Sequence, residues 1–174
     1  MNGQELMQKL LHSYERSYDI TAPCQVNGHT YDAAAYFNES GAKYVLTKKA
    51  ELWRISCYED VYFRVTDHLD EAAVDEFLND FINWIEPKVV RGGKEVPDTD
   101  HMYTLVTGIF FADQPVSKEV KRKIRRYHFY KNYRFALRGY CQVRLLVFDM
   151  AERKLIGNRA ARELIKGYNK VFRP

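Results

Sequence analysis

The strongest constraint on the fold is an amphipathic helix pattern over residues 67–86, in the middle of the chain. Its apolar residues recur at helical spacing, which predicts a helix that packs one face against a sheet. This apolar stripe consists of Val74, Phe77, Leu78, Phe81, Ile82 and Ile85. Asp67 can cap the helix, and Pro87 is expected to end it. The opposite face is strongly acidic and is expected to lie outward.

Extended patterns precede this helix. After a first amphipathic helix over residues 3–16, the pair Asn27-Gly28 favours a two-residue hairpin turn. Strands are then expected near residues 29–37, 43–48, 51–57 and 61–66. A turn is expected at Tyr58 to Asp60, and links this short predict an antiparallel meander.

The second half of the chain alternates between strands and helices. We expect a buried strand over residues 102–112, then a helix that begins near Ser117 and runs to about Lys131 or Leu137 before Gly139 ends it. A central strand over residues 140–148, a short strand near Leu155 and a last helix over residues 159–168 complete the expected elements.

The order of these elements, α-ββββ-α-β-α-ββ-α, predicts an α+β fold. We expect a largely antiparallel β-meander extended by two further strands and packed by about four helices. A chain of 174 residues falls within the usual size of one domain, so residues 1–174 are expected to form a single compact α+β domain.

Charge is divided unevenly along the sequence. Residues 1–114 carry a net charge of −9, whereas residues 115–174 carry +13. Between Lys118 and Arg138 the sequence holds nine basic residues and one acid, Glu119, interleaved with aromatic residues. Such a run is typical of surfaces that meet phosphates, and it favours a polyanionic partner.

Helical spacing turns Val120, Ile124 and Tyr127 toward the sheet and leaves basic side chains pointing outward. The leading hypothesis is therefore non-catalytic binding of a polyanion, with nucleic acid as the expected ligand. Arginine and lysine would contact phosphates, and tyrosine rings would stack on unpaired bases. The candidate residues are Arg122, Arg125, Arg126, Tyr130, Lys131, Tyr133 and Arg134.

Two other functions stay open. The acidic helix 67–86 and the basic helix could neutralise each other, or could join two copies or a protein partner, as a protein-interaction or homo-oligomerisation module. The third class is an enzyme, either nuclease-like or acting on a small anion held by arginines.

The order helix, three strands, helix, strand resembles the αβββαβ core of the restriction-endonuclease-like PD-(D/E)xK family, the alternative fold. Letters of its motif occur at Pro97-Asp98 and Glu119-Val120-Lys121. The resemblance implies metal-binding acids on adjacent strands of a hairpin, whereas Glu119 and Lys121 open a predicted helix. It therefore covers strand order only, and fold order does not establish chemistry.

Cofactor and compartment signals are few. The cysteines Cys24, Cys57 and Cys141 are far apart and odd in number, which favours a reducing cytoplasm over a disulfide framework. The sequence spells no nucleotide loop, no helical histidine pair and no nucleophile elbow, so neither cofactor nor metal is expected. The longest apolar stretches are too short for a membrane span.

Overall fold

The computed structural model describes residues 1–42 and 54–172 and has an α+β fold, as the sequence predicts. Its described residues form a seven-stranded sheet in the order β1-β4-β5-β6-β8-β7, with β9 also paired to β8. The strands are β1 (Asp19–Thr21), β4 (Ala33–Ala42), β5 (Arg54–Thr66), β6 (His101–Ala112), β7 (Tyr130–Asn132), β8 (Tyr140–Asp149) and β9 (Lys154–Gly157). The strand predicted near 43–48 lies outside the described residues.

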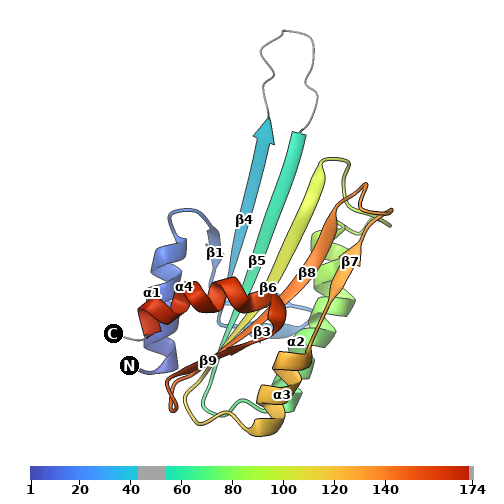
Figure 1. Cartoon of the computed structure of the whole chain (residues 1–174). Coiled ribbons are helices and arrows are strands. Elements are labelled where there is room, and N and C mark those ends of the chain that lie inside the picture. Colours follow the sequence, from blue (N-terminus) through green and yellow to red (C-terminus); the bar gives the residue numbers. More distant parts are fainter. Residues whose placement is uncertain (43–53, 173–174) are drawn as a thin grey trace.

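Helices cover both faces of this sheet (Figure 1). On one face lie α1 (Gly3–Tyr14) and α4 (Arg162–Phe172), which follows a short 3-10 turn, η2 (Arg159–Ala161). On the other face lie α2 (Glu71–Asp80), its π-helical continuation η1 (Phe81–Val90), and α3 (Lys118–Arg126). Within the described ranges, no helix is long and apolar enough to cross a membrane.

Most strand pairs are antiparallel, but the centre of the sheet is parallel. β4 and β5 form an antiparallel hairpin, whereas β5 pairs with β6, and β6 with β8, in parallel. Parallel neighbours need a crossover connection, which α2 with η1 supplies between β5 and β6 and α3 supplies between β6 and β8. The sheet therefore combines an antiparallel hairpin, β4–β5, with a parallel centre, β5-β6-β8, whose strands are connected by helices.

The predicted hairpin turn at Asn27-Gly28 is confirmed. It joins β2 (Cys24–Val26) to β3 (His29–Tyr31), which form a separate two-stranded sheet beside α2. Asn27 has φ 52° and Gly28 has φ 84°, as a turn with two left-handed central residues requires.

Strand alternation divides the apolar residues into two cores. In β5, Val61 and Phe63 pack with α1, whereas Tyr62 lies under α2. The same period of two sends Ile109 of β6 to the first core and Phe110 to the second. Both faces of the central strands are therefore buried where helices cross them.

Three local predictions are wrong. β5 continues through the expected turn at Tyr58–Asp60, because it pairs with β4 on one edge and β6 on the other. The central helix begins with Asp70 as its cap, not Asp67, and continues past Pro87 as a π-helix. The basic helix ends at Arg126, since the chain then extends into β7.

Candidate functional site

The exposed surface of α3 carries the first group of predicted site residues. Ser117 caps this helix by accepting a hydrogen bond from the Val120 amide. Val120 and Ile124 are buried against the sheet, as predicted. The arginines at positions 122, 125 and 126 are exposed on the opposite side, and among the described residues none of them forms an ion pair.

The lysines of α3 are used differently from its arginines. Lys121 lies 2.8 Å from Glu152 and 3.2 Å from the buried Asp149. Lys123 lies 2.6 Å from Asp75 of α2, so the acidic and basic helices do meet, as one sequence hypothesis anticipated. This ion pair neutralises a lysine and leaves the three arginines of the helix uncompensated.

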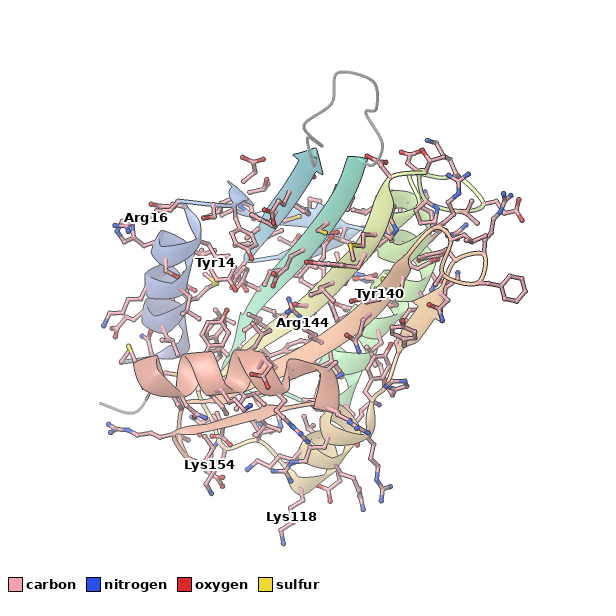
Figure 2. The ribbon with its side chains drawn as sticks, turned by 45° about the horizontal axis from the view of Figure 1, so that its top comes forward. Tyr14, Arg16, Lys118, Tyr140, Arg144 and Lys154 are labelled. Carbon is pink, nitrogen blue, oxygen red and sulfur yellow. The ribbon has the colours of Figure 1, made fainter. Side chains whose placement is uncertain are left out.

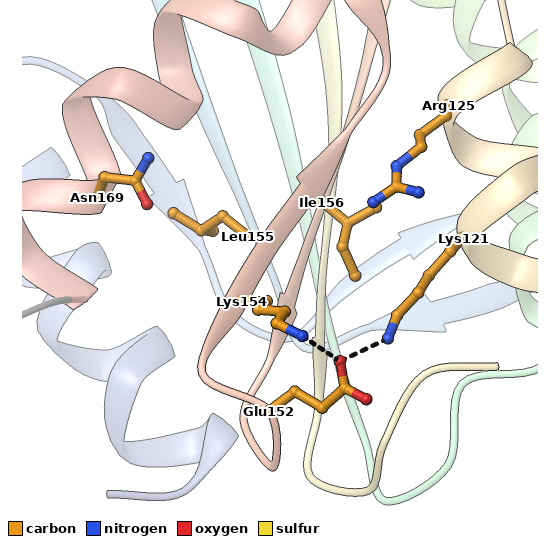
Figure 3. Close-up of a pocket in the computed structure, with 7 residues that line it drawn as sticks. All are labelled: Lys121, Arg125, Glu152, Lys154, Leu155, Ile156 and Asn169. Atoms are coloured by element: carbon orange, nitrogen blue, oxygen red, sulfur yellow. Dashed lines mark hydrogen bonds and ion pairs between the residues drawn. The ribbon is translucent and has the colours of Figure 1, made fainter. Parts of the chain in front are cut away.

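A small cavity of about 240 Å³ opens between α3, β9 and α4 (Figure 3). Its walls combine three basic side chains and one carboxylate with an apolar strand edge and one amide. The lining residues are Lys121, Arg125, Glu152, Lys154, Leu155, Ile156 and Asn169. A volume below that of typical drug-sized sites suits an anion such as a phosphate group.

The electrostatics of this cavity favour a negative ligand. Burial would lower the pKa of Lys121, but its hydrogen bonds to Glu152 and Asp149 outweigh burial and raise that pKa. Hydrogen bonds from Lys121 and then Lys154 lower the pKa of Glu152. Arg125 adds a positive charge without an acidic partner among the described residues.

The second group of predicted residues lies in and after β7, and the structure corrects one of them. Tyr133 is 2% exposed, and its hydroxyl donates a hydrogen bond to Glu86, so its ring cannot stack on a base. Lys131 also binds Glu86, at 2.8 Å, so its charge is already paired. Tyr130 and Arg134 are exposed, as a binding role requires.

The buried carboxylate of Glu86 accepts hydrogen bonds from both Lys131 and Tyr133. It lies in η1 and also accepts two hydrogen bonds from Arg91, at 2.9 and 3.0 Å. Burial would raise the pKa of Glu86, but the hydrogen bonds from Arg91, Lys131 and Tyr133 lower it overall. No sequence pattern indicated this centre, because Glu86 and Tyr133 are 47 positions apart.

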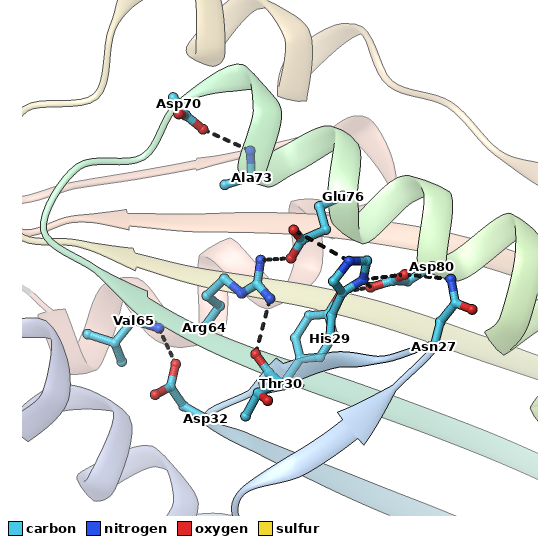
Figure 4. A network of polar contacts seen from close by, with 11 residues as sticks. Asn27, His29, Thr30, Asp32, Arg64, Val65, Asp70, Ala73, Glu76 and Asp80 are labelled. Atoms are coloured by element: carbon cyan, nitrogen blue, oxygen red, sulfur yellow. Dashed lines mark hydrogen bonds and ion pairs between the residues drawn. The ribbon is translucent and has the colours of Figure 1, made fainter.

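A polar network joins the β2–β3 hairpin to α2 (Figure 4). The fully buried Asp80 lies 2.9 Å from His29 and accepts hydrogen bonds from Asn27 and Tyr31. Among the described residues, His29, Glu76 and Asp80 form a group whose ligand atoms lie within 4.8 Å of one another, so they could hold a metal ion. The hydrogen bond between His29 and Asp80, with Glu76 3.8 Å from the same imidazole, already explains the arrangement as a link between hairpin and helix.

Another charged pair crosses the central strands on the α1/α4 face, and its arginine, Arg144, is labelled in Figure 2. Arg144 of β8 donates hydrogen bonds to Glu59 of β5 and, at 2.9 Å, to Thr107 of β6. The Tyr18 hydroxyl donates to the same Glu59 at 2.9 Å, and burial and the Glu59 charge raise the pKa of that tyrosine. Sequence reasoning missed this pair, although an arginine inside the apolar run of β8 was a visible signal.

The letters that resemble a nuclease motif do not form a site. Asp98 lies in the loop before β6 and binds Lys94, and Glu119 lies in the first turn of α3. The order α1, β1, β4, β5, α2, β6 does follow the αβββαβ pattern when the β2–β3 hairpin is set aside. The resemblance therefore remains one of element order.

Comparison with known proteins assigns the chain to a family. The sequence profile of the family described as Domain of unknown function (DUF8052) matches residues 2–170. Because this match covers nearly the whole chain, the protein belongs to that family. No curated protein and no solved structure matches the chain.

Proposed function

We propose that the protein binds a polyanion without catalysis, and that the ligand is nucleic acid. The observation that carries the proposal is the exposure of Arg122, Arg125 and Arg126 on one helix without acidic partners among the described residues. Uncompensated cations attract phosphates and release the counterions that surround them. Lys121 and Lys123 are expected to contribute less to phosphate binding, because each is already paired with an acid.

Further basic residues support this placement of the ligand. Lys118 of α3 and Lys154 of β9 lie at the same end of the molecule (Figure 2). Arg153, Arg159 and Arg162 are also exposed, in the turn before β9 and in the segment that leads into α4. Arg125 lines the cavity between these elements, so a phosphate group seated there would contact a residue of the proposed surface.

Filter binding over a salt series tests the proposal. We expect affinity for nucleic acid to fall linearly with the logarithm of salt concentration, with a slope that reflects the number of phosphate contacts. Absence of salt-sensitive binding at low ionic strength would overturn it.

A second candidate function, self-association or binding of a protein partner, is favoured by the loop after β7. Phe135 is 100% exposed and Leu137 is 80% exposed. Arg134, Phe135 and Ala136 all have positive φ, which presents these side chains from a tight loop. Light scattering after size exclusion, at low and high salt, tests this candidate. An apolar contact through Phe135 persists at high salt, whereas association between charged faces weakens.

A further inference from the structure

The α1/α4 face of the sheet is covered along only part of its length. Strand register aligns its residues in rows across β5, β6 and β8. Phe63, Ile109 and Leu146 form one such row and are buried. Further along the same face, the row of Cys57, Tyr103 and Tyr140 is only half-buried. This end of the face is therefore accessible, while the other end is core.

The accessible end carries a continuous run of aromatic rings. Tyr103 and Tyr140 are register partners on β6 and β8, with ring centroids 5.7 Å apart and planes 28° apart. The ring of Tyr130 in β7 lies 5.0 Å from that of Tyr140, with an interplanar angle of 32°, and Tyr130 is 46% exposed. The rings thus form a surface that spans three neighbouring strands.

Hydrogen-bonding side chains lie next to these rings. Gln142, half-buried, is the register partner of both Leu105 and Tyr130, so its amide belongs to the row beside Tyr140. The pair formed by Arg144 and Glu59 follows on the same face. The amide of Gln142 can bond the edges of bases whose faces stack on tyrosine, whereas Arg144 is buried and already bonded to Glu59 and Thr107.

Positive charge lies at both ends of the segment that contains Tyr130. The exposed Arg126 ends α3 four positions before this tyrosine, and the exposed Arg134 follows it by four. Phosphates of a strand whose bases contact the rings would meet these charges. A duplex hides the faces of its bases, so stacking on this surface selects an unpaired strand.

We propose that Tyr103, Tyr130 and Tyr140 form a stacking platform for the bases of single-stranded nucleic acid. This inference rests on the proposed function and narrows it to one class of ligand. In this proposal Tyr103 and Tyr140, whose rings lie on the accessible end of the α1/α4 face, take the stacking role that the sequence predicted for the buried Tyr133. Binding then combines a phosphate-contacting helix with a base-contacting sheet.

Fluorescence anisotropy with a labelled thymidine oligonucleotide, alone and as a duplex, tests the platform. We expect the single strand to bind more tightly, and Tyr140→Ala to weaken that binding about ten-fold. Tyr140→Phe keeps a ring and is expected to retain most of the affinity. Tyr58→Ala, on the opposite face of β5, is the matched control and should leave affinity unchanged. Tyr130→Ala, on a short edge strand, repeats the test if Tyr140→Ala fails to fold.

The outcomes separate the two proposals. If neither nucleic acid binds at low salt, both fail. If single strand and duplex bind equally, and the tyrosine variants bind as the parent does, the platform is overturned. The proposed function still stands in that case, provided that replacing the α3 arginines weakens binding and lowers its salt dependence.

Discussion

α3 and the β7 segment that follows it are both basic, yet the fold leaves the arginines of α3 in solvent and turns residues of the β7 segment inward. On α3, Arg122 and Arg126 project into solvent without acidic partners among the described residues. After β7 begins, Lys131 and Tyr133 turn inward to one buried acid, Glu86. The difference teaches that composition alone does not mark a binding surface. A basic or aromatic side chain is lost to a binding surface when an acid, such as Glu86, lies close enough to bond it.

Side chains alternate between the two faces of the sheet along β7, so this short strand contributes both to the accessible ring surface and to the buried centre at Glu86. Tyr130 lies on the α1/α4 face, where its ring contacts Tyr140. Lys131 points to the other face, where η1 places Glu86. Neighbouring residues of one strand therefore belong to the accessible face and to the buried centre.

The largest effect is expected where the buried acid is removed. Glu86→Gln deprives Arg91 and Lys131 of their counter-charge, so the free energy of unfolding should fall by about 2–4 kcal/mol. Urea unfolding measures the change. Glu119→Gln, in an exposed first turn, is the control and should change stability by less than about 0.5 kcal/mol. Equal effects of the two variants would contradict the structural role of Glu86.

The same centre predicts how stability depends on pH. Because the folded pKa of Glu86 is lowered, its contribution is present above the pKa of the unfolded chain and is lost as pH falls through the folded pKa. The parent should therefore lose more stability than Glu86→Gln between neutral and acidic pH, as urea midpoints at both pH values would report. Parallel declines in the two proteins would show that Glu86 does not titrate in this way.

Asp60 also predicts a pH dependence of stability, but with the opposite sign to that of Glu86, because its pKa is raised rather than lowered. The expected effect is smaller. This buried acid forms no ion pair among the described residues, and burial, with the charge of Glu59, raises its pKa to about 7. The folded state thus holds a proton that the unfolded chain loses at lower pH, so ionisation of Asp60 costs stability as pH rises toward 8. Asp60→Asn should gain stability relative to the parent between pH 5 and pH 8, by on the order of 2 kcal/mol. A constant difference between the two proteins across this range would contradict the raised pKa.

The smallest effect is expected at the ion pair between the acidic and basic helices. Lys123 and Asp75 are partly exposed, and such pairs contribute about 0–1 kcal/mol. A double-mutant cycle with Lys123→Ala and Asp75→Ala measures the coupling. A coupling above about 2 kcal/mol would mean that this ion pair, rather than the buried acid at η1, organises the basic segment.

Much of the fold follows from patterns that act over a few residues. The Asn27-Gly28 turn and the central strand at β8 were predicted, since turn chemistry and strand-forming runs are local. The turn expected at Tyr58–Asp60 was wrong, because pairing with two neighbouring strands overrides the local signal. Long-range pairing cannot be derived from such local rules.

In the candidate site, too, the features set by local spacing were predicted and those set by distant contacts were not. Helical spacing was enough to predict that Val120 is buried and that Arg122 is exposed. The burial of Tyr133 was not predictable, because it depends on Glu86 in a distant π-helix. The ring surface on β6 and β8 was missed because register brings Tyr103 and Tyr140 together.

The most direct test is the salt dependence of single-strand binding when Arg122, Arg125 and Arg126 are all replaced by glutamine. We expect the slope of log affinity against log salt to decrease in magnitude by about 0.7 for each phosphate that these side chains no longer neutralise. Thermal stability should stay near that of the parent, because these side chains form no ion pairs among the described residues. An unchanged slope with intact folding would contradict the claim that the α3 arginines are the charges left for a polyanionic partner.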